Sequence, residues 1–226
     1  MVLRGGEVLD GTGAPAYRAD VGVTGGRITA VGRLTDALAG TVIDARGRYV
    51  TPGFVDTHAH AEAAVLSSEV QLATLRQGVT TLILGQDGLS FAPSTPAALA
   101  FVRRYFGAIN GEHPGLGDGG VSVAQLRSTW HGTTAVNTAY LVPAATVRYS
   151  VLDGRPGRAD PAGLARMREL VETGLADGAV GLSSGLEYLP GRYADAEGML
   201  KAGTPYAVAS SEVGASVIAL RAEARL

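Results

Sequence analysis

Two histidines stand one residue apart in TPGFVDTHAHAE (51–62), at the end of an apolar stretch. Side chains two residues apart point the same way in an extended strand, so His58 and His60 would project together, with Asp56 two residues before them. Two adjacent imidazoles can hold a divalent metal ion such as zinc. A solvated loop with a chance pair of histidines is the alternative, and the spacing alone does not decide between the two.

A third possible metal ligand follows the next predicted strand, in GQDGLSFAP. If the two strands are parallel neighbours, the turn that carries Asp87 lies at the same edge of the sheet as His58 and His60. Its carboxylate would then supply a third ligand. Asp-Gly is also a very common turn pair, so Asp87 gains this role only through its place beside the histidines.

The segment GLSSG resembles the nucleophile turn G-x-S-x-G of serine hydrolases, with Ser183 as the nucleophile. That arrangement requires a histidine later in the chain, and the last histidine of this sequence is His131. We therefore expect Ser183 to end a strand, and a serine hydrolase is the least favoured alternative.

The next segment, LEYLPGRYAD, places aromatic and charged residues in a predicted loop. Tyr188 and Arg192 could bind a polar or carboxylate-bearing ligand there, with the Arg192 guanidinium as an anion clamp. A Pro-Gly turn with solvated charges is the alternative for this segment.

The composition is that of a globular protein large enough to bury its own core. The chain has 226 residues, 46% of them hydrophobic, and a formal net charge of −2. The absence of a basic block argues against nucleic acid or an anionic membrane as the main partner. Cysteine is absent, which suits a reducing compartment. No segment is apolar for long enough to be a signal peptide or a membrane span, so we expect a cytoplasmic protein.

Residues 1–50 show the pattern of short strands in a small β domain. Two β-rich runs around Gly25-Gly26 predict a hairpin, and TVIDARGRYV predicts a second strand pair around Ala45–Gly47. We expect this segment to be the N-terminal part of a small β-sandwich.

From residue 51 to residue 226, predicted strands and helices alternate, which indicates an α/β fold with a parallel sheet, either a barrel or a doubly wound layer. A complete (β/α)8 barrel has eight strands and about 250 residues, so a barrel here would be incomplete, with about five strands. The predicted strands lie at 49–57, 80–85, 135–142, 179–184 and 204–210. The predicted helices lie at 61–78, 94–109, 121–130, 160–178, 195–202 and 212–226.

Several stretches resemble one known family. RGGEVLDGTGAPAYRADVGVTGGRITAVG and VIDARGRYVTPGFVDTHAHAE are similar to the entry of the amidohydrolase superfamily. GVTTLILGQDGLSFAP and GAVGLSSGLEYLPGRYA resemble its N-acyl-D-amino-acid deacylase (D-aminoacylase) branch. The resemblance covers nearly the whole chain. It implies a metal-bearing (β/α)8 barrel, present here as its N-terminal part only, beside a small β domain built from both chain ends.

The resemblance also implies an activity, which is hydrolysis of the linear amide bond of an N-acyl-D-amino acid by a metal-activated water. It implies that His58 and His60 bind zinc, as one or two divalent ions. Asp87 stands where well-known members have a cysteine ligand, and its harder oxygen should weaken the preference for zinc. Tyr188 matches the substrate-contacting tyrosine of the family.

The sequence departs from the family pattern at three places. Ala144 and Ala145 occupy the turn where a histidine is expected, and Ala209 lies where a metal-binding histidine should end the fifth strand. The general-base aspartate of the family falls beyond residue 226, so no catalytic base is assigned.

Two functions therefore stay open. The chain is either part of a D-aminoacylase-like hydrolase, weakly active or inactive alone, or a non-catalytic relic or binding subunit of the same fold. An incomplete barrel leaves an unpaired strand edge and exposed apolar faces, which predicts self-association or a complementing C-terminal half.

Overall fold

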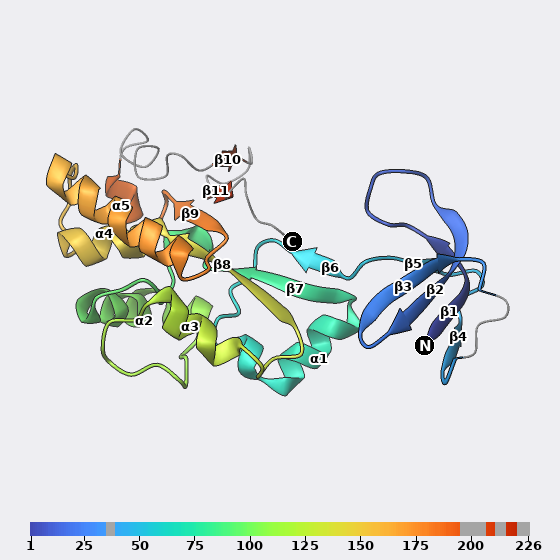
Figure 1. Ribbon diagram of the computed structural model, residues 1–226. Coiled ribbons are helices and arrows are strands. Elements are labelled where there is room, and N and C mark those ends of the chain that lie inside the picture. The colour runs from blue at the N-terminus through green and yellow to red at the C-terminus, as the bar shows by residue number, and fades with distance from the viewer. Residues whose placement is uncertain (35–38, 195–206, 211–215, 221–226) are drawn as a thin grey trace. The chain divides into compact units, whose positions relative to one another are not determined.

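The computed structural model of the chain describes residues 1–34, 39–194, 207–210 and 216–220 (Figure 1). The chain divides into two compact units, Met1–Gly53 and Phe54–Leu226, and each is described by itself. Among the described residues, no helix has both the length and the apolar character needed to cross a bilayer.

The first unit contains one five-stranded sheet in the order β3-β2-β1-β4, with β5 also paired to β1 (Figure 1). The hairpin predicted at Gly25-Gly26 is confirmed, because β2 and β3 pair antiparallel across it. Both glycines have positive φ angles, 58° and 76°, which a tight two-residue hairpin turn requires. The strands are β1 (Val2–Val8), β2 (Tyr17–Thr24), β3 (Arg27–Gly32), β4 (Val42–Asp44) and β5 (Tyr49–Val50).

The strand pair predicted around Ala45–Gly47 is wrong. β4 and β5 do not pair with each other, and each runs parallel to a different part of β1. The Asp44 carboxylate accepts the backbone N–H of Arg46 at 3.0 Å, a local turn that displaces the chain without reversing its direction. The two short strands therefore continue along one edge of β1.

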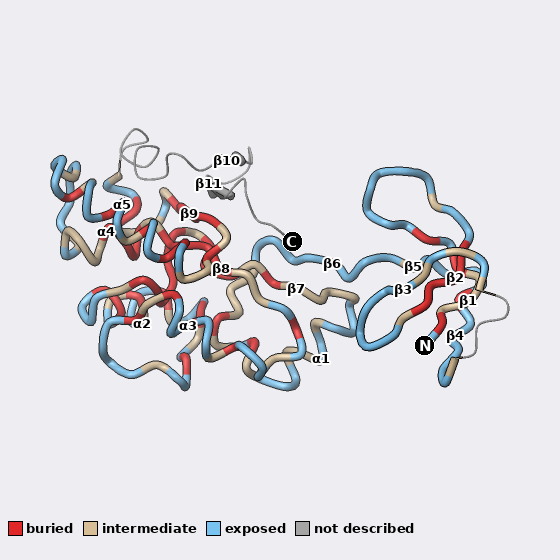
Figure 2. The backbone as a smooth tube through the Cα atoms, viewed as in Figure 1, coloured by how far each residue is buried: buried red, intermediate tan, exposed pale blue. Residues whose placement is uncertain are grey.

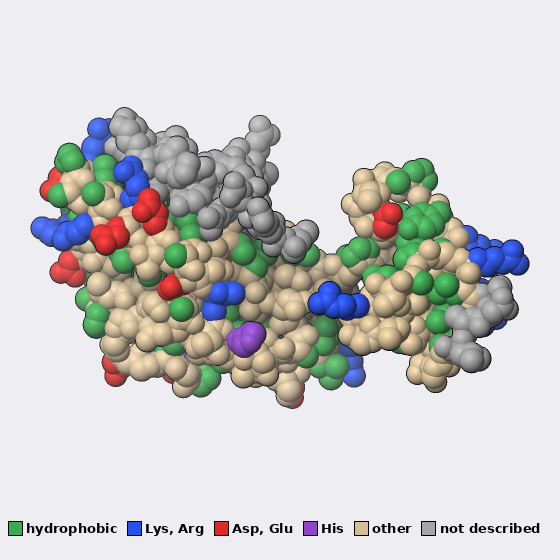
Figure 3. Space-filling view, in the orientation of Figure 1, with side chains coloured by type: hydrophobic (Ala, Val, Ile, Leu, Met, Phe, Trp, Pro, Cys, Tyr) green, Lys and Arg blue, Asp and Glu red, His purple; other side chains and the backbone are tan. Residues whose placement is uncertain are grey.

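The sheet of the first unit buries few side chains. Its buried cluster consists of Val8, Ala19 and Val21 (Figure 2). Green side chains are prominent on the face of this unit drawn in Figure 3. The second layer that a β-sandwich would need is not seen among the described residues of this unit. The exposed large apolar side chains of the strands include Tyr17, Ile28, Val31, Val42, Ile43 and Tyr49.

The second unit is built on four parallel strands whose order in the sheet, β6-β7-β8-β9, is their order in the chain. Helical segments connect the strands. An order without reversal is typical of a (β/α) barrel, whereas a doubly wound sheet reverses its order at a switch point. The strands are β6 (Phe54–Asp56), β7 (Val79–Leu84), β8 (Asn137–Pro143) and β9 (Gly181–Gly185).

The helices predicted at 94–109, 121–130 and 160–178 are confirmed as α2, α3 and α5, and the helix predicted at 61–78 is confirmed in part as η1 and α1. α4 was not predicted, because its sequence AATVRYSVL has several β-branched residues and its N-terminus has no side-chain cap. The helix predicted at 195–202 lies outside the described residues. The helical segments are η1 (Ala64–Leu66), α1 (Ser68–Arg76), η2 (Gln86–Gly88), α2 (Pro96–Asn110), α3 (Val123–Trp130), α4 (Ala144–Leu152), α5 (Pro161–Ala176) and η3 (Gly191–Tyr193).

Two predictions at the end of the chain are wrong. The predicted fifth parallel strand is β10 (Ala207–Ser210), which pairs antiparallel with β11 (Ser216–Leu220). The predicted helix at 212–226 contains β11, which pairs antiparallel with β9. The β-branched pair in SVIAL favours a strand, and the edge of β9 offers it backbone partners.

The core of the second unit lies between the parallel strands and the helices α2, α3 and α5. Buried positions concentrate there (Figure 2). Its largest fully buried aromatic side chains are Phe91, Phe106, Trp130 and Tyr140. This packing holds the ends of the strands, and the loops that follow them, in fixed positions.

Helix α3 begins with a reciprocal cap, in which the Ser122 hydroxyl accepts the Gln125 N–H at 3.1 Å and the Gln125 side chain accepts the Ser122 N–H at 2.8 Å. We expect Ser122→Ala to lower the free energy of unfolding by about 1 kcal/mol, because it leaves a helix N–H without its partner. Urea denaturation followed by circular dichroism measures the change. Ser128→Ala, on the exposed side of the same helix, is the control and should change it by less than about 0.5 kcal/mol.

Candidate metal centre

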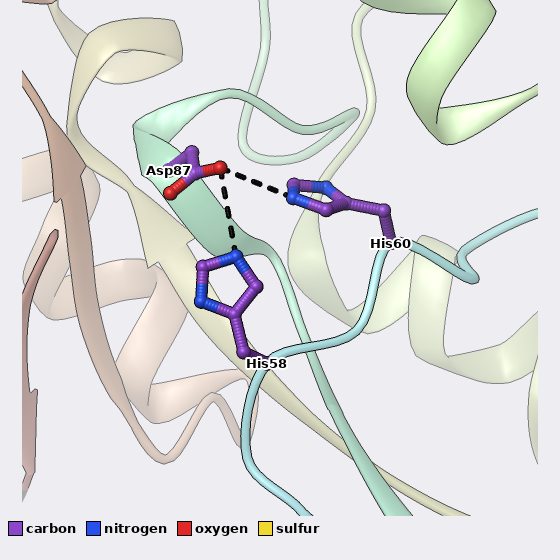
Figure 4. Close-up of side chains that lie close together, drawn as sticks. All are labelled: His58, His60 and Asp87. Atoms are coloured by element: carbon purple, nitrogen blue, oxygen red, sulfur yellow. Dashed lines mark hydrogen bonds and ion pairs between the residues drawn. The ribbon is translucent and has the colours of Figure 1, made fainter. Parts of the chain in front are cut away.

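The two histidines and Asp87 come together at the C-terminal ends of neighbouring parallel strands. His58 and His60 follow β6, and Asp87 lies in η2, directly after β7. Figure 4 shows the Asp87 carboxylate turned toward both imidazole rings. This edge is where loops of a (β/α) barrel gather functional groups.

The reason for the shared direction of the two rings differs from the expected one. β6 ends at Asp56, so the histidines do not project from a strand. The Asp56 carboxylate accepts the His58 N–H at 3.1 Å, and the Ala59 N–H donates to the carbonyl of Ile83 at 3.2 Å. These bonds tie the histidine segment to β7 and place both rings beside the turn that follows it.

The turn that carries Asp87 has an unusual backbone. Asp87 has a φ of +56°, between Gly85 at +81° and Gly88 at +71°. Aspartate tolerates this left-handed region better than most residues, and such backbone conformations are frequent at functional sites. The turn directs the side chain of Asp87 toward the two histidines that follow β6.

The donor atoms have distances that fit a single ion. The Asp87 Oδ2 lies 3.1 Å from the His60 Nε2 and 3.6 Å from the His58 Nε2. One ligand atom from each of the three residues lies within 4.8 Å of the other two. Ligands at 2.0–2.1 Å from a tetrahedral zinc ion would be about 3.3 Å apart, so the two short distances bracket the value for a shared ion.

The environment of His60 is more constrained than that of His58. His60 is half-buried, its ring meets the ring of Phe106 edge-on at 5.6 Å, and its Nδ1 lies 3.0 Å from the Asn110 Oδ1. The hydrogen bond with Asp87 is the main cause that raises the pKa of His60. His58 is exposed, which leaves its side of the site open to a ligand.

Glu62 is a site residue that we did not predict from the sequence. It is fully buried, and its Oε1 accepts the Gly85 N–H at 3.0 Å and the Ser90 hydroxyl at 2.8 Å. Burial raises the pKa of its carboxyl group. Glu62 thus joins the histidine segment to both ends of the turn that carries Asp87. The spacing H-A-H-A-E, with a third polar residue two positions on, was the signal that could have found it.

Ser183 lies inside β9, not on a turn between a strand and a helix. It is buried, its hydroxyl donates to the carbonyl of Gly85, and its Oγ accepts the Gly88 N–H at 3.1 Å. Ser183 therefore holds the Asp87 turn against the next strands of the sheet.

The two predicted substrate-binding residues lie in the loop after β9. Tyr188 packs edge-on against Phe106 at 5.1 Å, and Phe106 also contacts His60. Partial burial and then the negative charge of Asp87 raise the pKa of Tyr188. Arg192 is exposed in η3, and its backbone N–H donates to the carbonyl of Tyr188 at 2.8 Å.

The alanines that stand where histidines were expected lie in regular secondary structure. Ala144 and Ala145 form the first turn of α4, directly after β8, and Ala145 is buried. Ala209 lies in β10. His58, His60 and Asp87 form the group among the described residues that could hold a metal ion.

Comparison with known proteins gives relatives for almost the whole chain. It is 36% identical to the D-aminoacylase of Alcaligenes xylosoxydans xylosoxydans over 208 residues, which are 91% of this chain and 41% of that protein. It is also 36% identical to the N-acyl-D-glutamate deacylase of the same organism, over 86% of this chain and 39% of that protein. The chain therefore spans about two fifths of the length of these relatives.

Solved structures agree with the sequence matches. A crystal structure of D-aminoacylase superposes with a TM-score of 0.73 at 33% identity, over 89% of this chain and 42% of that one. The N-acyl-D-glutamate deacylase of Bordetella bronchiseptica, in complex with zinc and a phosphonate inhibitor, gives a TM-score of 0.75 at 33% identity, over 89% and 41%. The profile of the Amidohydrolase family matches residues 41–221. From this match and these relatives, the chain belongs to the amidohydrolase family.

Proposed function

We propose that this chain is the N-terminal part of a metal-dependent amidohydrolase that removes the acyl group from an N-acyl-D-amino acid. Residues 51–226 would be part of its catalytic barrel, and residues 1–50 would be the N-terminal part of a small β-sandwich. The observation that carries the proposal is the convergence of His58, His60 and Asp87 in a chain related to deacylases. A cytoplasmic location suits the cysteine-free sequence.

The donor set fits a divalent metal ion. Two imidazole nitrogens and one carboxylate oxygen are ligands that zinc accepts, and the fully buried Glu62 ties the supporting loops together. One or two ions could be held. When bound, the ion would polarise the amide carbonyl and lower the pKa of a bound water toward neutrality.

The chain's own residues would hold the ion and orient the substrate. Tyr188 packs on Phe106, the ring that also meets His60, and would offer its hydroxyl to the substrate. Arg192 would offer a guanidinium that pairs with the carboxylate of an amino acid. The proton-transfer group of the reaction is assigned to no residue of this chain. We propose that a complementing segment supplies this group. The same segment would cover the outer edge of β6, which pairs only with β7 among the described residues.

The second candidate is a non-catalytic relic or binding subunit of the same fold. The structural observation that favours it is the start of α4 at Ala144 and Ala145, where the family resemblance leads us to expect a histidine. Under this alternative, the three-residue cluster holds an ion weakly or not at all, and no segment completes a hydrolytic site.

Metal analysis of the purified 226-residue chain tests the centre. We expect about one zinc ion per chain, and we expect Asp87→Ala to weaken zinc binding on the order of a hundredfold, since it removes one of three ligands. Competition with a chromophoric chelator measures the affinity. Asp118→Ala, which removes an exposed carboxylate bonded to Arg103, is the matched control and should bind zinc as the wild type does.

Hydrolysis of an N-acyl-D-amino acid separates the two functions. Turnover by the chain, alone or with a complementing C-terminal half from a related deacylase, supports the hydrolase. Zinc binding without turnover in either case supports the non-catalytic alternative. A chain that holds no zinc contradicts the hydrolase, and stoichiometric zinc together with turnover contradicts the non-catalytic alternative.

A further inference from the structure

We propose that Asn110 is a positioning residue that fixes which ring nitrogen of His60 faces the metal ion. The inference rests on the metal centre proposed above and adds a residue from outside its ligand set. Asn110 is the last residue of α2, its side chain is buried at 1% exposure, and it lies fifty positions along the chain from His60.

The orientation of the Asn110 amide follows from its second partner. The carbonyl oxygen of Leu89 lies 3.0 Å from the Asn110 side chain, and a carbonyl oxygen can only accept a hydrogen bond. The atom of Asn110 that faces Leu89 is therefore the amide nitrogen. The amide oxygen is then the atom that faces the ring of His60.

This orientation determines the role of each nitrogen of His60. The Asn110 Oδ1 lies 3.0 Å from the His60 Nδ1, and an amide oxygen only accepts, so Nδ1 must carry the proton of that bond. Nε2 is left to face Asp87, at 3.1 Å from its Oδ2. A histidine that binds metal through one nitrogen usually donates from the other to a fixed acceptor, and here the acceptor is the Asn110 oxygen.

The packing around Asn110 keeps its position constant. Gly111, which directly follows the last residue of α2, has a φ of +74° and lies against Ala63. Phe106, one turn earlier in α2, meets the ring of His60 edge-on. Leu89 follows the turn that carries Asp87, so one amide group links the histidine segment, the Asp87 loop and α2.

Two substitutions distinguish the positioning of the His60 ring from a purely structural role of Asn110. Asn110→Leu removes the acceptor for His60 and the donor to Leu89. Asn110→Asp also removes the donor to Leu89 but keeps an oxygen that accepts from the His60 Nδ1. The two variants therefore share the structural loss, and only Asn110→Leu loses the partner of the histidine.

We expect Asn110→Leu to bind zinc about 10–100-fold more weakly than the wild type, and Asn110→Asp to bind within about tenfold of it. Chelator competition measures the affinities, and denaturation by urea checks that each variant is folded. Asn137→Leu is the control. Asn137 also donates to a backbone carbonyl, that of Thr80, but it lies at the start of β8, whereas the candidate metal centre lies at the C-terminal ends of the strands. Its zinc affinity should not change.

Long-range proton–nitrogen spectra of the histidine-labelled, zinc-loaded chain read the ring directly, with His60→Gln to assign the signal. Protonated Nδ1 and metal-bound Nε2 in the wild type and in Asn110→Asp support the inference. A His60 bound through Nδ1, an Asn110→Leu variant as tight as the wild type, or an Asn110→Asp variant as weak as Asn110→Leu overturns it.

A failure of the metal centre would look different. If the wild type holds no zinc, the proposed function falls, and the spectra of the metal-free chains still test Asn110. A proton on the His60 Nδ1 in the wild type and Asn110→Asp that is lost in Asn110→Leu, whose ring keeps its proton on the Nε2 that faces Asp87, supports positioning. The same tautomer distribution in all three chains overturns it.

Discussion

Gly85→Ala is expected to lower the free energy of unfolding of the second unit by about 3–5 kcal/mol, a large effect for one methyl group. Gly85 has a φ of +81°, and a Cβ atom at this position would overlap the backbone carbonyl of Leu141 in the adjacent strand β8. Leu141 is paired with Gly181 of β9, so its carbonyl cannot move aside without disrupting the sheet. Urea denaturation followed by circular dichroism gives the change in stability.

The matched control is Gly132→Ala, in the same unit. Gly132 has a similar φ of +72°, and a Cβ there would meet nothing within 4 Å. Gly132→Ala should lower the free energy of unfolding only by the backbone strain of an alanine in the left-handed region, about 1–2 kcal/mol. If the two variants lost equal stability, the close approach of Gly85 to β8 would not be what makes this glycine necessary. Gly85→Ala should also weaken zinc binding, because Gly85 is the first residue of the turn that carries Asp87.

Sequence patterns predicted the elements whose signals are local. The helix predicted at 160–178 and the hairpin at Gly25-Gly26 each need only a few neighbouring residues, and both are present as α5 and the β2–β3 pair. α4 and β11 have no such signals. α4 is buried on several sides and carries β-branched residues, and the strand state of β11 depends on pairing with β9, which is distant in sequence.

The candidate site shows the same division. The proposed ligands His58, His60 and Asp87 could be named from residue types and from the expectation that parallel strands end at one edge. The residues that support them could not, because their roles depend on contacts across the fold. Asn110 meets His60 from the end of a helix fifty residues away, and Ser183 meets the Asp87 turn from β9. The position of an asparagine or a serine in the sequence does not by itself predict such a supporting role.

Glu62→Ala should be nearly as destabilising as the change at Gly85. Glu62 is fully buried, and its Oε1 accepts hydrogen bonds from the Gly85 N–H and the Ser90 hydroxyl. Alanine would leave both buried donors without their acceptor, at about 1–3 kcal/mol each, and would open a cavity. We expect a loss of about 3–5 kcal/mol in the free energy of unfolding, measured by urea denaturation.

Glu62→Gln distinguishes the hydrogen bonds from the charge. Glutamine keeps the oxygen that accepts from Gly85 and Ser90, so its stability should lie within about 1 kcal/mol of the wild type. Glu69→Ala, at an exposed position in the first turn of α1, is the control and should cost less than about 1 kcal/mol. If Glu62→Gln were as unstable as Glu62→Ala, the negative charge and not the shared acceptor would hold the Asp87 turn to the histidine segment. The zinc affinity of the glutamine variant should then fall with its stability, whereas the hydrogen-bond account expects both to stay close to those of the wild type.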